Sequence, residues 1–140
     1  MEERKAAKLN ANILAYIGDA IYDLHIREKI VAKGTSDVSK AHRIAIRYVS
    51  CDGQSYAARQ LMKSGFLTED EIVILKRARN HRTMSRPKNA DPRDYKVATG
   101  FEALIGYLHL TGSDDRVREI VDEAVRLVEE KNNLTLTYRL

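Results

Sequence analysis

Two acidic residues stand beside glycines inside stretches that carry a helical pattern. Asp19 follows Gly18 in AYIGDAIYDL, and Glu102 lies between Gly100 and Gly106 in ATGFEALIGYL. A glycine inside a helix costs roughly 1 kcal/mol relative to alanine, and it is tolerated where another backbone must approach closely. The pattern therefore predicts that two helices cross at these glycines and that Asp19 and Glu102 face each other.

Two carboxylates held together repel unless one keeps a proton or a cation lies between them. Mg²⁺ suits such a pair, because it takes one or two carboxylates, keeps several waters and accepts phosphate oxygens. Asp19 and Glu102 are therefore candidate metal ligands and candidate catalytic residues for phosphodiester cleavage, and we expect Mn²⁺ to substitute for Mg²⁺. The alternative is that these acids cap helices, pair with arginine or face solvent. Asp23 is a candidate to hold a metal-bound water or to pair with Arg27, four residues further on.

The positive charge of the chain is concentrated in one segment. Residues 76–96 contain eight lysines and arginines against two aspartates, a net charge of +6, whereas the rest of the chain sums to −2. Such a segment is typical of a polyanion contact, with a solvated basic loop as the alternative. The residues expected to make this contact are Arg77, Arg79, Arg82, Arg86, Lys88 and Asn89.

The elements that must position these residues are all helical. Apolar residues recur with a helical period and nowhere alternate over a sustained stretch, which predicts a single all-α domain of about six helices. Three of the expected helices span about 10–33, 52–64 and 91–110. The other three begin at N-caps near residues 35–36, 68 and 113. The first helix is expected to bury Ile13, Ile17, Ala20, Ile21 and Leu24.

Composition limits the class of protein. The chain has 140 residues, of which 44% are apolar and 31% charged, which is typical of one globular domain with a core. No apolar run approaches the roughly 20 residues that cross a bilayer. Cys51, the single cysteine, cannot form an internal disulfide, so we expect a cytoplasmic protein. We treat residues 1–140 as one domain and expect residues 1–8 and 132–140 to be flexible ends.

Several separated motifs resemble one family. AYIGDA (15–20) resembles the signature helix of the ribonuclease III family, and FEALIGYL (101–108) resembles its second acidic helix. More specifically, the chain resembles the short bacterial mini-ribonuclease III branch from about Leu9 to Val128. The resemblance includes LKRARN (75–80), PKN (87–89) and Tyr95. Members of that branch lack the double-stranded RNA-binding domain of the longer family, so the resemblance implies that the six residues named in the basic segment contact RNA in its place. A-form RNA is recognised mainly through its shape, phosphates and 2′-hydroxyls, and spaced cations suffice for that.

The resemblance implies a homodimeric, Mg²⁺-dependent endonuclease that cuts double-stranded RNA and leaves 5′-phosphate and 3′-hydroxyl ends. In this branch the expected substrate is a stem in precursor large-subunit (23S) ribosomal RNA, and a ribosomal protein or pre-ribosomal particle is a further candidate partner. By the resemblance, Asp19 and Glu102 fall on metal-site positions, and Tyr16 lies beside the dimer axis.

The chain departs from the longer family at three positions. Asn12, Ala15 and Thr99 stand where that family carries carboxylates. The number of ions is therefore open, and one firmly bound Mg²⁺ with a second arriving with the RNA is our hypothesis. The missing carboxylates favour the alternative function, a catalytically silent RNA-binding dimer that acts in ribosome assembly. A purely structural helical protein that binds an acidic partner is a third interpretation.

Overall fold

The computed structural model describes residues 1–81 and 89–133, and within these residues it contains seven helices and no strand. The predicted all-α fold is confirmed. None of these helices is both long enough and apolar enough to span a membrane. The helices are α1 (Glu3–Ala7), α2 (Ala11–Ala32), α3 (Val38–Val49), α4 (Cys51–Lys63), α5 (Glu69–Arg79), α6 (Pro92–Leu110) and α7 (Asp114–Asn132).

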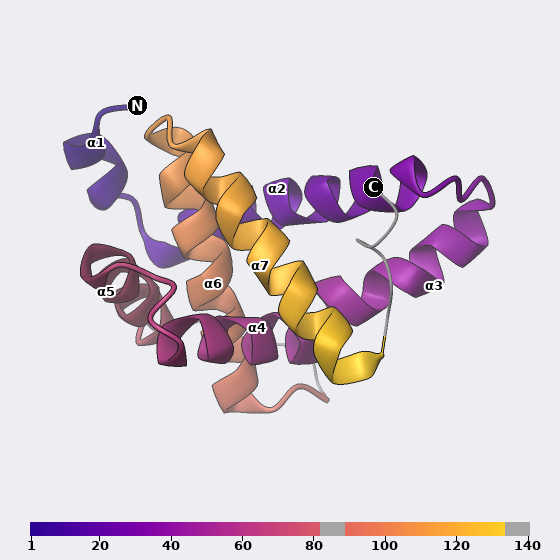
Figure 1. Ribbon diagram of the computed structural model, residues 1–140. Coiled ribbons are helices and arrows are strands. Elements are labelled where there is room, and N and C mark those ends of the chain that lie inside the picture. Colours follow the sequence, from indigo (N-terminus) through magenta and orange to yellow (C-terminus); the bar gives the residue numbers. More distant parts are fainter. Residues whose placement is uncertain (82–88, 134–140) are drawn as a thin grey trace.

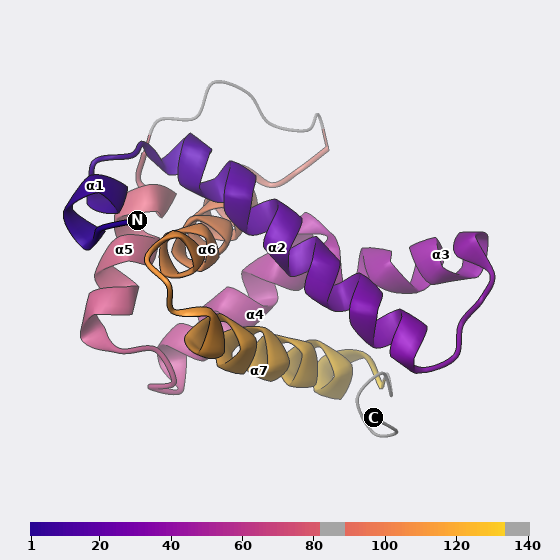
Figure 2. The same cartoon turned by 90° about the horizontal axis from the view of Figure 1, so that it is seen from above.

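Helix α6 is the centre of the fold. It packs against α2, α4, α5 and α7, with α2 crossing it on one side and α7 lying along another (Figures 1 and 2). Phe101, Leu104 and Ile105 are fully buried on it, and the ring of Tyr22 on α2 meets the Phe101 ring edge to face, with 5.3 Å between centroids. Each such side chain contributes about 1.5–3 kcal/mol when buried. The acidic residue of α6 is therefore carried on the helix with the most buried residues among those described.

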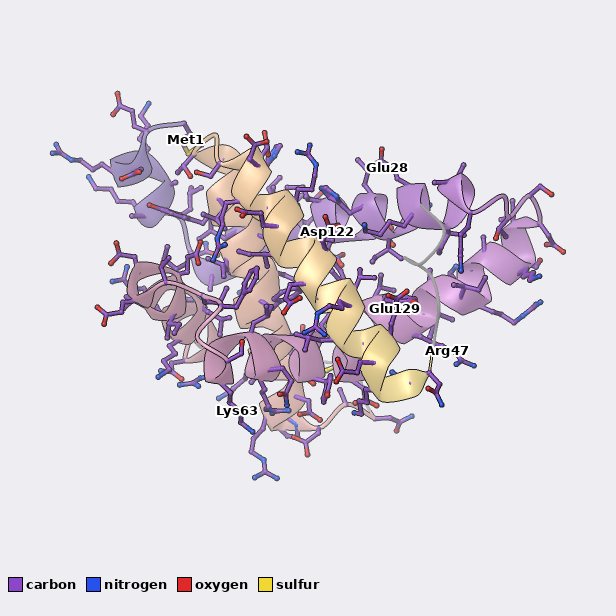
Figure 3. All side chains as sticks on the ribbon, in the orientation of Figure 1. Met1, Glu28, Arg47, Lys63, Asp122 and Glu129 are labelled. Carbon is purple, nitrogen blue, oxygen red and sulfur yellow. The ribbon has the colours of Figure 1, made fainter. Side chains whose placement is uncertain are left out.

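Helix α7 closes one side of the domain with the predicted apolar stripe. All its members are buried, namely Val117, Ile120, Val121, Ala124 and Val128. Figure 3 shows Asp122 and Glu129 along this helix, and they contact α2 and α3 respectively. Lys29 Nζ lies 2.6 Å from Asp122 Oδ1, and Tyr48 Oη donates to Glu129 Oε2 at 3.4 Å.

Most helix boundaries follow the predicted caps. Thr68 and Glu71 form the expected capping box at α5, and Asp91 caps α6 with Pro92 in its first turn. The predicted start of α3 is wrong, because Asp37 caps it in place of residues 35–36 and accepts from Ser39 N at 2.9 Å. The Asp37 carboxylate also accepts from Lys40 N at 3.3 Å, so it satisfies two N–H groups that have no partner within the helix.

A short helix precedes the first predicted one. α1 occupies Glu3–Ala7, with Ala6 fully buried. The amino group of Met1 donates to the carbonyl of Leu110 at 2.7 Å, so α1 is tied to the end of α6.

The predicted buried face of α2 is wrong. Ile13 and Leu24 are 47% and 56% exposed, and Tyr16 on the same side is 75% exposed. The face that packs against the core instead carries Ala11, Leu14, Ala15, Gly18, Tyr22, Ile26 and Ile30. Because α2 is apolar on both sides, periodicity alone does not identify the inner one. Gly18 identifies the inner face, because α6 approaches α2 at this residue. We call Ile13, Tyr16 and Leu24 the α2 outer face.

Candidate active site

Helices α2 and α6 cross in backbone contact. A Cβ atom added to Gly18 would lie 1.6 Å from the carbonyl oxygen of Glu102, and one added to Gly106 would lie 2.0 Å from the carbonyl oxygen of Leu14. No side chain fits in either space. The predicted crossing is confirmed for these two glycines. It is wrong for Gly100, which faces α5, where an added Cβ would lie 2.6 Å from the carbonyl oxygen of Leu75.

The crossing brings together the two predicted acids. Asp19 lies on the exposed side of α2, directly after the glycine, and Glu102 lies half-buried on α6. Their side chains are within hydrogen-bonding reach of each other. Burial, followed by the hydrogen bond to Asp19 and the Asp19 charge, raises the pKa of Glu102 from its ordinary 4.5 to about 9. At neutral pH and without a cation, Glu102 therefore keeps its proton and donates it to Asp19.

Gln54 is a third polar group at this point, and it was missed in the sequence analysis. It lies in the first turn of α4 and is only 3% exposed. Its side chain lies within hydrogen-bonding reach of Glu102 and favours the charged carboxylate. Gln54 shares a helix face with the buried residues Ala58 and Leu61, and a glutamine at that spacing is the signal that could have identified it.

The three positions at which the longer family carries carboxylates provide no carboxylate to the site in this chain. Ala15 is buried against the core, Asn12 is exposed, and the hydroxyl of Thr99 donates to the carbonyl of Tyr95 at 3.0 Å. Within residues 1–81 and 89–133, no three His, Cys, Asp or Glu side chains are grouped so that they could share an ion. Asp23 pairs with Arg27, with 2.9 Å between Oδ2 and Nε, which was one of the two alternatives for it.

The residues present nevertheless fit a hard divalent cation. Two carboxylates converge although their charges repel, and in the described part of the chain the buried oxygen of the Gln54 amide accepts no hydrogen bond. Carboxylate and amide oxygens are the ligand types that Mg²⁺ and Mn²⁺ take up, with water completing the shell. A site with two carboxylates suits a metal that stays largely hydrated and also meets phosphate.

The predicted RNA-contacting residues fall into two groups. Arg82, Arg86 and Lys88 lie outside the described residues. Among the others, Arg77 and Asn89 are exposed and Arg79 is half-buried. Neither arginine pairs with an acid in the described part of the chain.

The described end of the basic segment packs against α6. Arg77 borders a cavity of about 150 Å³ between the α1–α2 junction, α5 and α6. The side chain of Arg79 lies beside Gly100, two residues before Glu102. The two arginines at the end of α5 therefore lie next to α6, the helix that carries Glu102.

Comparison with known proteins identifies the family. The ribonuclease III domain model matches residues 12–113. The chain is 42% identical to Mini-ribonuclease 3 of Enterococcus faecalis over 129 residues, which cover 92% of this chain and 98% of the relative. It is 43% identical to Mini-ribonuclease 3 of Clostridium tetani over 126 residues, which cover 89% and 82% of the two chains.

A solved structure agrees with this result. The fold is similar to a crystal structure of a Fusobacterium nucleatum protein, with a TM-score of 0.74 and 28% sequence identity. The similarity covers 85% of this chain and 93% of that one. The chain therefore belongs to the ribonuclease III family, with its relatives among the Mini-ribonuclease 3 proteins, and is an endoribonuclease of that type.

Proposed function

We propose that this protein cleaves double-stranded RNA as a homodimer, with Asp19 and Glu102 holding Mg²⁺ as catalytic metal ligands, and that its substrate is a stem in precursor large-subunit (23S) ribosomal RNA. The observation that carries the catalytic part is the convergence of Asp19 and Glu102 at the glycine crossing. The ribosomal substrate rests on the resemblance to the mini-ribonuclease III branch.

The chain's own residues hold and orient the reacting groups. The Gly18–Gly106 contact fixes the distance between the two helices, so the carboxylates of Asp19 and Glu102 stay in register. Bound Mg²⁺ supplies polarisation of the scissile phosphate and activation of a water. Glu102 must give up its proton to become a ligand, so binding of the ion releases a proton. Attack of water on phosphorus with departure of the 3′ oxygen leaves the expected 5′-phosphate and 3′-hydroxyl ends.

The α2 outer face supports a dimer. Ile13, Tyr16 and Leu24 are large, apolar and about half or more exposed on one side of the helix that carries Asp19. A second copy that packs on this face would bury these side chains, and the assembly would then contain two acidic sites. Two such sites suit a substrate with two strands.

Substitution of Asp19 tests the catalytic assignment. In Asp19→Asn we expect cleavage of a long RNA duplex to fall about a thousandfold or more, because a carboxylate that holds the metal accounts for several kcal/mol of transition-state stabilisation. Duplex binding, measured in Ca²⁺, should change little. Asp23→Asn is the matched control one turn further along α2, and we expect it to cleave normally. Normal turnover in Asp19→Asn would disprove the assignment.

A silent RNA-binding dimer acting in ribosome assembly is the second candidate. The observation that favours it is the lack of a carboxylate at Ala15 and Thr99, both buried in the structure. The same duplex assay separates the two functions. A wild-type protein that retains RNA but yields no 5′-phosphorylated fragments with Mg²⁺ or Mn²⁺ is the silent one.

A further inference from the structure

Among the residues that the structure describes, Gln54 carries a buried side-chain oxygen that accepts no hydrogen bond. In the described part of the chain, its Oε1 is the single buried side-chain nitrogen or oxygen atom without a hydrogen-bond partner. Other buried polar side chains in residues 1–81 and 89–133 have hydrogen-bond partners. Ser55 donates to the carbonyl of Asp52, and Glu71 accepts from Arg116 twice at 2.8 Å. Since burying a carbonyl without a donor costs free energy, an orphan at this position calls for an explanation.

The orientation of the Gln54 amide follows from its neighbours. One end lies 2.8 Å from the carbonyl oxygen of Val49, the last residue of α3. A carbonyl oxygen only accepts hydrogen bonds, so this end must be the NH₂ group. Flipping the amide would place two oxygens against each other. Oε1 therefore points away from Val49 and cannot exchange roles with Nε2.

The same amide borders the acidic site, because it lies within hydrogen-bonding reach of Glu102. Helix α4 is held firmly there. Gly53, the preceding residue, packs so closely on the end of α3 that an added Cβ would lie 2.4 Å from the carbonyl oxygen of Arg47. Ser50 caps the helix through a 3.1 Å bond from Gly53 N. Gln54 is thus a fixed polar group on a rigid turn.

We propose that Gln54 is a positioning residue of the metal site: its NH₂ group orients the Glu102 carboxylate, and its Oε1 accepts a hydrogen bond from a water in the hydration shell of the divalent cation. This inference rests on the proposed function, since it takes Asp19 and Glu102 as the ligands. A site with two carboxylates leaves most of the ion's shell to water, and buried acceptors that orient such waters strengthen binding.

Mn²⁺ titration of the RNA-free protein tests this role. We expect Gln54→Met, which keeps the length of the side chain but removes both polar atoms, to weaken Mn²⁺ binding about tenfold or more. Gln60→Met is the matched control, because Gln60 lies on the same helix and its side chain is half-buried. Gln54→Asn keeps the amide but withdraws it by one methylene, and we expect it to weaken Mn²⁺ binding as well, relative to Gln60→Asn.

Thermal unfolding without metal distinguishes this role from a structural one. A residue that only ties α4 to α3 would lower the melting temperature in Gln54→Met and leave Mn²⁺ affinity equal to that of Gln60→Met. That result overturns the inference. If Gln54→Met does not fold, Gln54→Asn decides, and Mn²⁺ binding in that variant equal to that of Gln60→Asn also overturns the inference.

Failure of the proposed function would look different. Wild-type protein that binds no Mn²⁺, or an Asp19→Asn variant that binds it normally, disproves the metal assignment and this inference together. Loss of the expected effect at position 54 alone, with Asp19→Asn still defective in Mn²⁺ binding, leaves the proposed function standing and removes Gln54 from the site.

Discussion

The raised pKa of Glu102 predicts that this protein loses stability as the pH rises unless a divalent cation is present. Its pKa is about 9 in the folded chain and near 4.5 ordinarily, so the folded state binds the proton more tightly than the unfolded state. The corresponding stability is fully present below pH 4.5, falls as the pH rises and is lost by the time the pH passes about 9. Substitution of Glu102 by glutamine should remove this dependence, because the amide never ionises.

The magnitude follows from the pKa change. One pKa unit corresponds to about 1.4 kcal/mol, so the full change would weaken folding by about 6 kcal/mol. Asp19 is exposed, and relaxation and water entry reduce the effect of burying a charge. We therefore expect about 2–4 kcal/mol between pH 5 and pH 8.5 in the wild-type protein relative to Glu102→Gln. In melting temperature this is about 5–15 °C.

The assay is thermal unfolding in EDTA across that pH range, for the wild-type protein, Glu102→Gln and the exposed control Glu69→Gln. As the pH rises, the melting temperature of the wild-type protein should fall relative to that of Glu102→Gln. The difference in melting temperature between the wild-type protein and Glu69→Gln should stay constant. Adding Mg²⁺ at pH 8.5 should raise the wild-type melting temperature, since a ligand that binds only the folded state stabilises it. A gap to Glu102→Gln that does not change from pH 5 to pH 8.5 would refute the reasoning.

Three further predictions follow from the packing and the surface. Gly18→Ala should destabilise the protein by about 3 kcal/mol or more in chemical denaturation, although alanine ordinarily favours a helix, because its Cβ would lie 1.6 Å from a carbonyl oxygen; a gain in stability would contradict the crossing. Tyr16→Arg should convert a dimer to a monomer in analytical ultracentrifugation, whereas Val73→Arg, at a residue 54% exposed on α5, should not; a dimer that persists in Tyr16→Arg would exclude the α2 outer face. The double variant of Arg77 and Arg79 to alanine should lower the salt slope of duplex binding by about 1–2, and an unchanged slope in filter binding would remove both residues from the RNA contact.

The sequence predicted the elements well where each had one apolar face. Helix α7 is an example, because its stripe from Val117 to Val128 alternates with charged residues and leaves only one face to bury. Helix α2 is the opposite case. Both of its faces are apolar, and only the close backbone contact at Gly18 decides which one packs on α6. Periodicity measures contrast between faces, so it fails where a second face is also apolar.

The acidic pair could be predicted because glycines mark close backbone approach. Gln54 could not be predicted in the same way, since a lone glutamine in an amphipathic helix is usually a surface residue. Its burial depends on α4 meeting α3 and α6 at one point, which is a tertiary fact with no local sequence signal beyond its spacing from Ala58 and Leu61.

The crossing of α2 and α6 stabilises the fold through close backbone packing, but it also brings two acidic side chains together. The Gly18–Gly106 contact gives α2 and α6 their closest packing, but it also forces Asp19 and Glu102 together, where one must stay protonated. Relieving the repulsion by substitution removes the charge that would hold a cation. Relieving it by a wider crossing loses the backbone contact on which the core is built. A divalent cation relieves the repulsion without widening the crossing, because it replaces the proton and leaves the helices in contact. The proton that the cation replaces is the one on Glu102. We therefore expect Mg²⁺ to stabilise the wild-type fold more at pH 8.5 than at pH 6, and to leave the stability of Glu102→Gln nearly unchanged at both pH values.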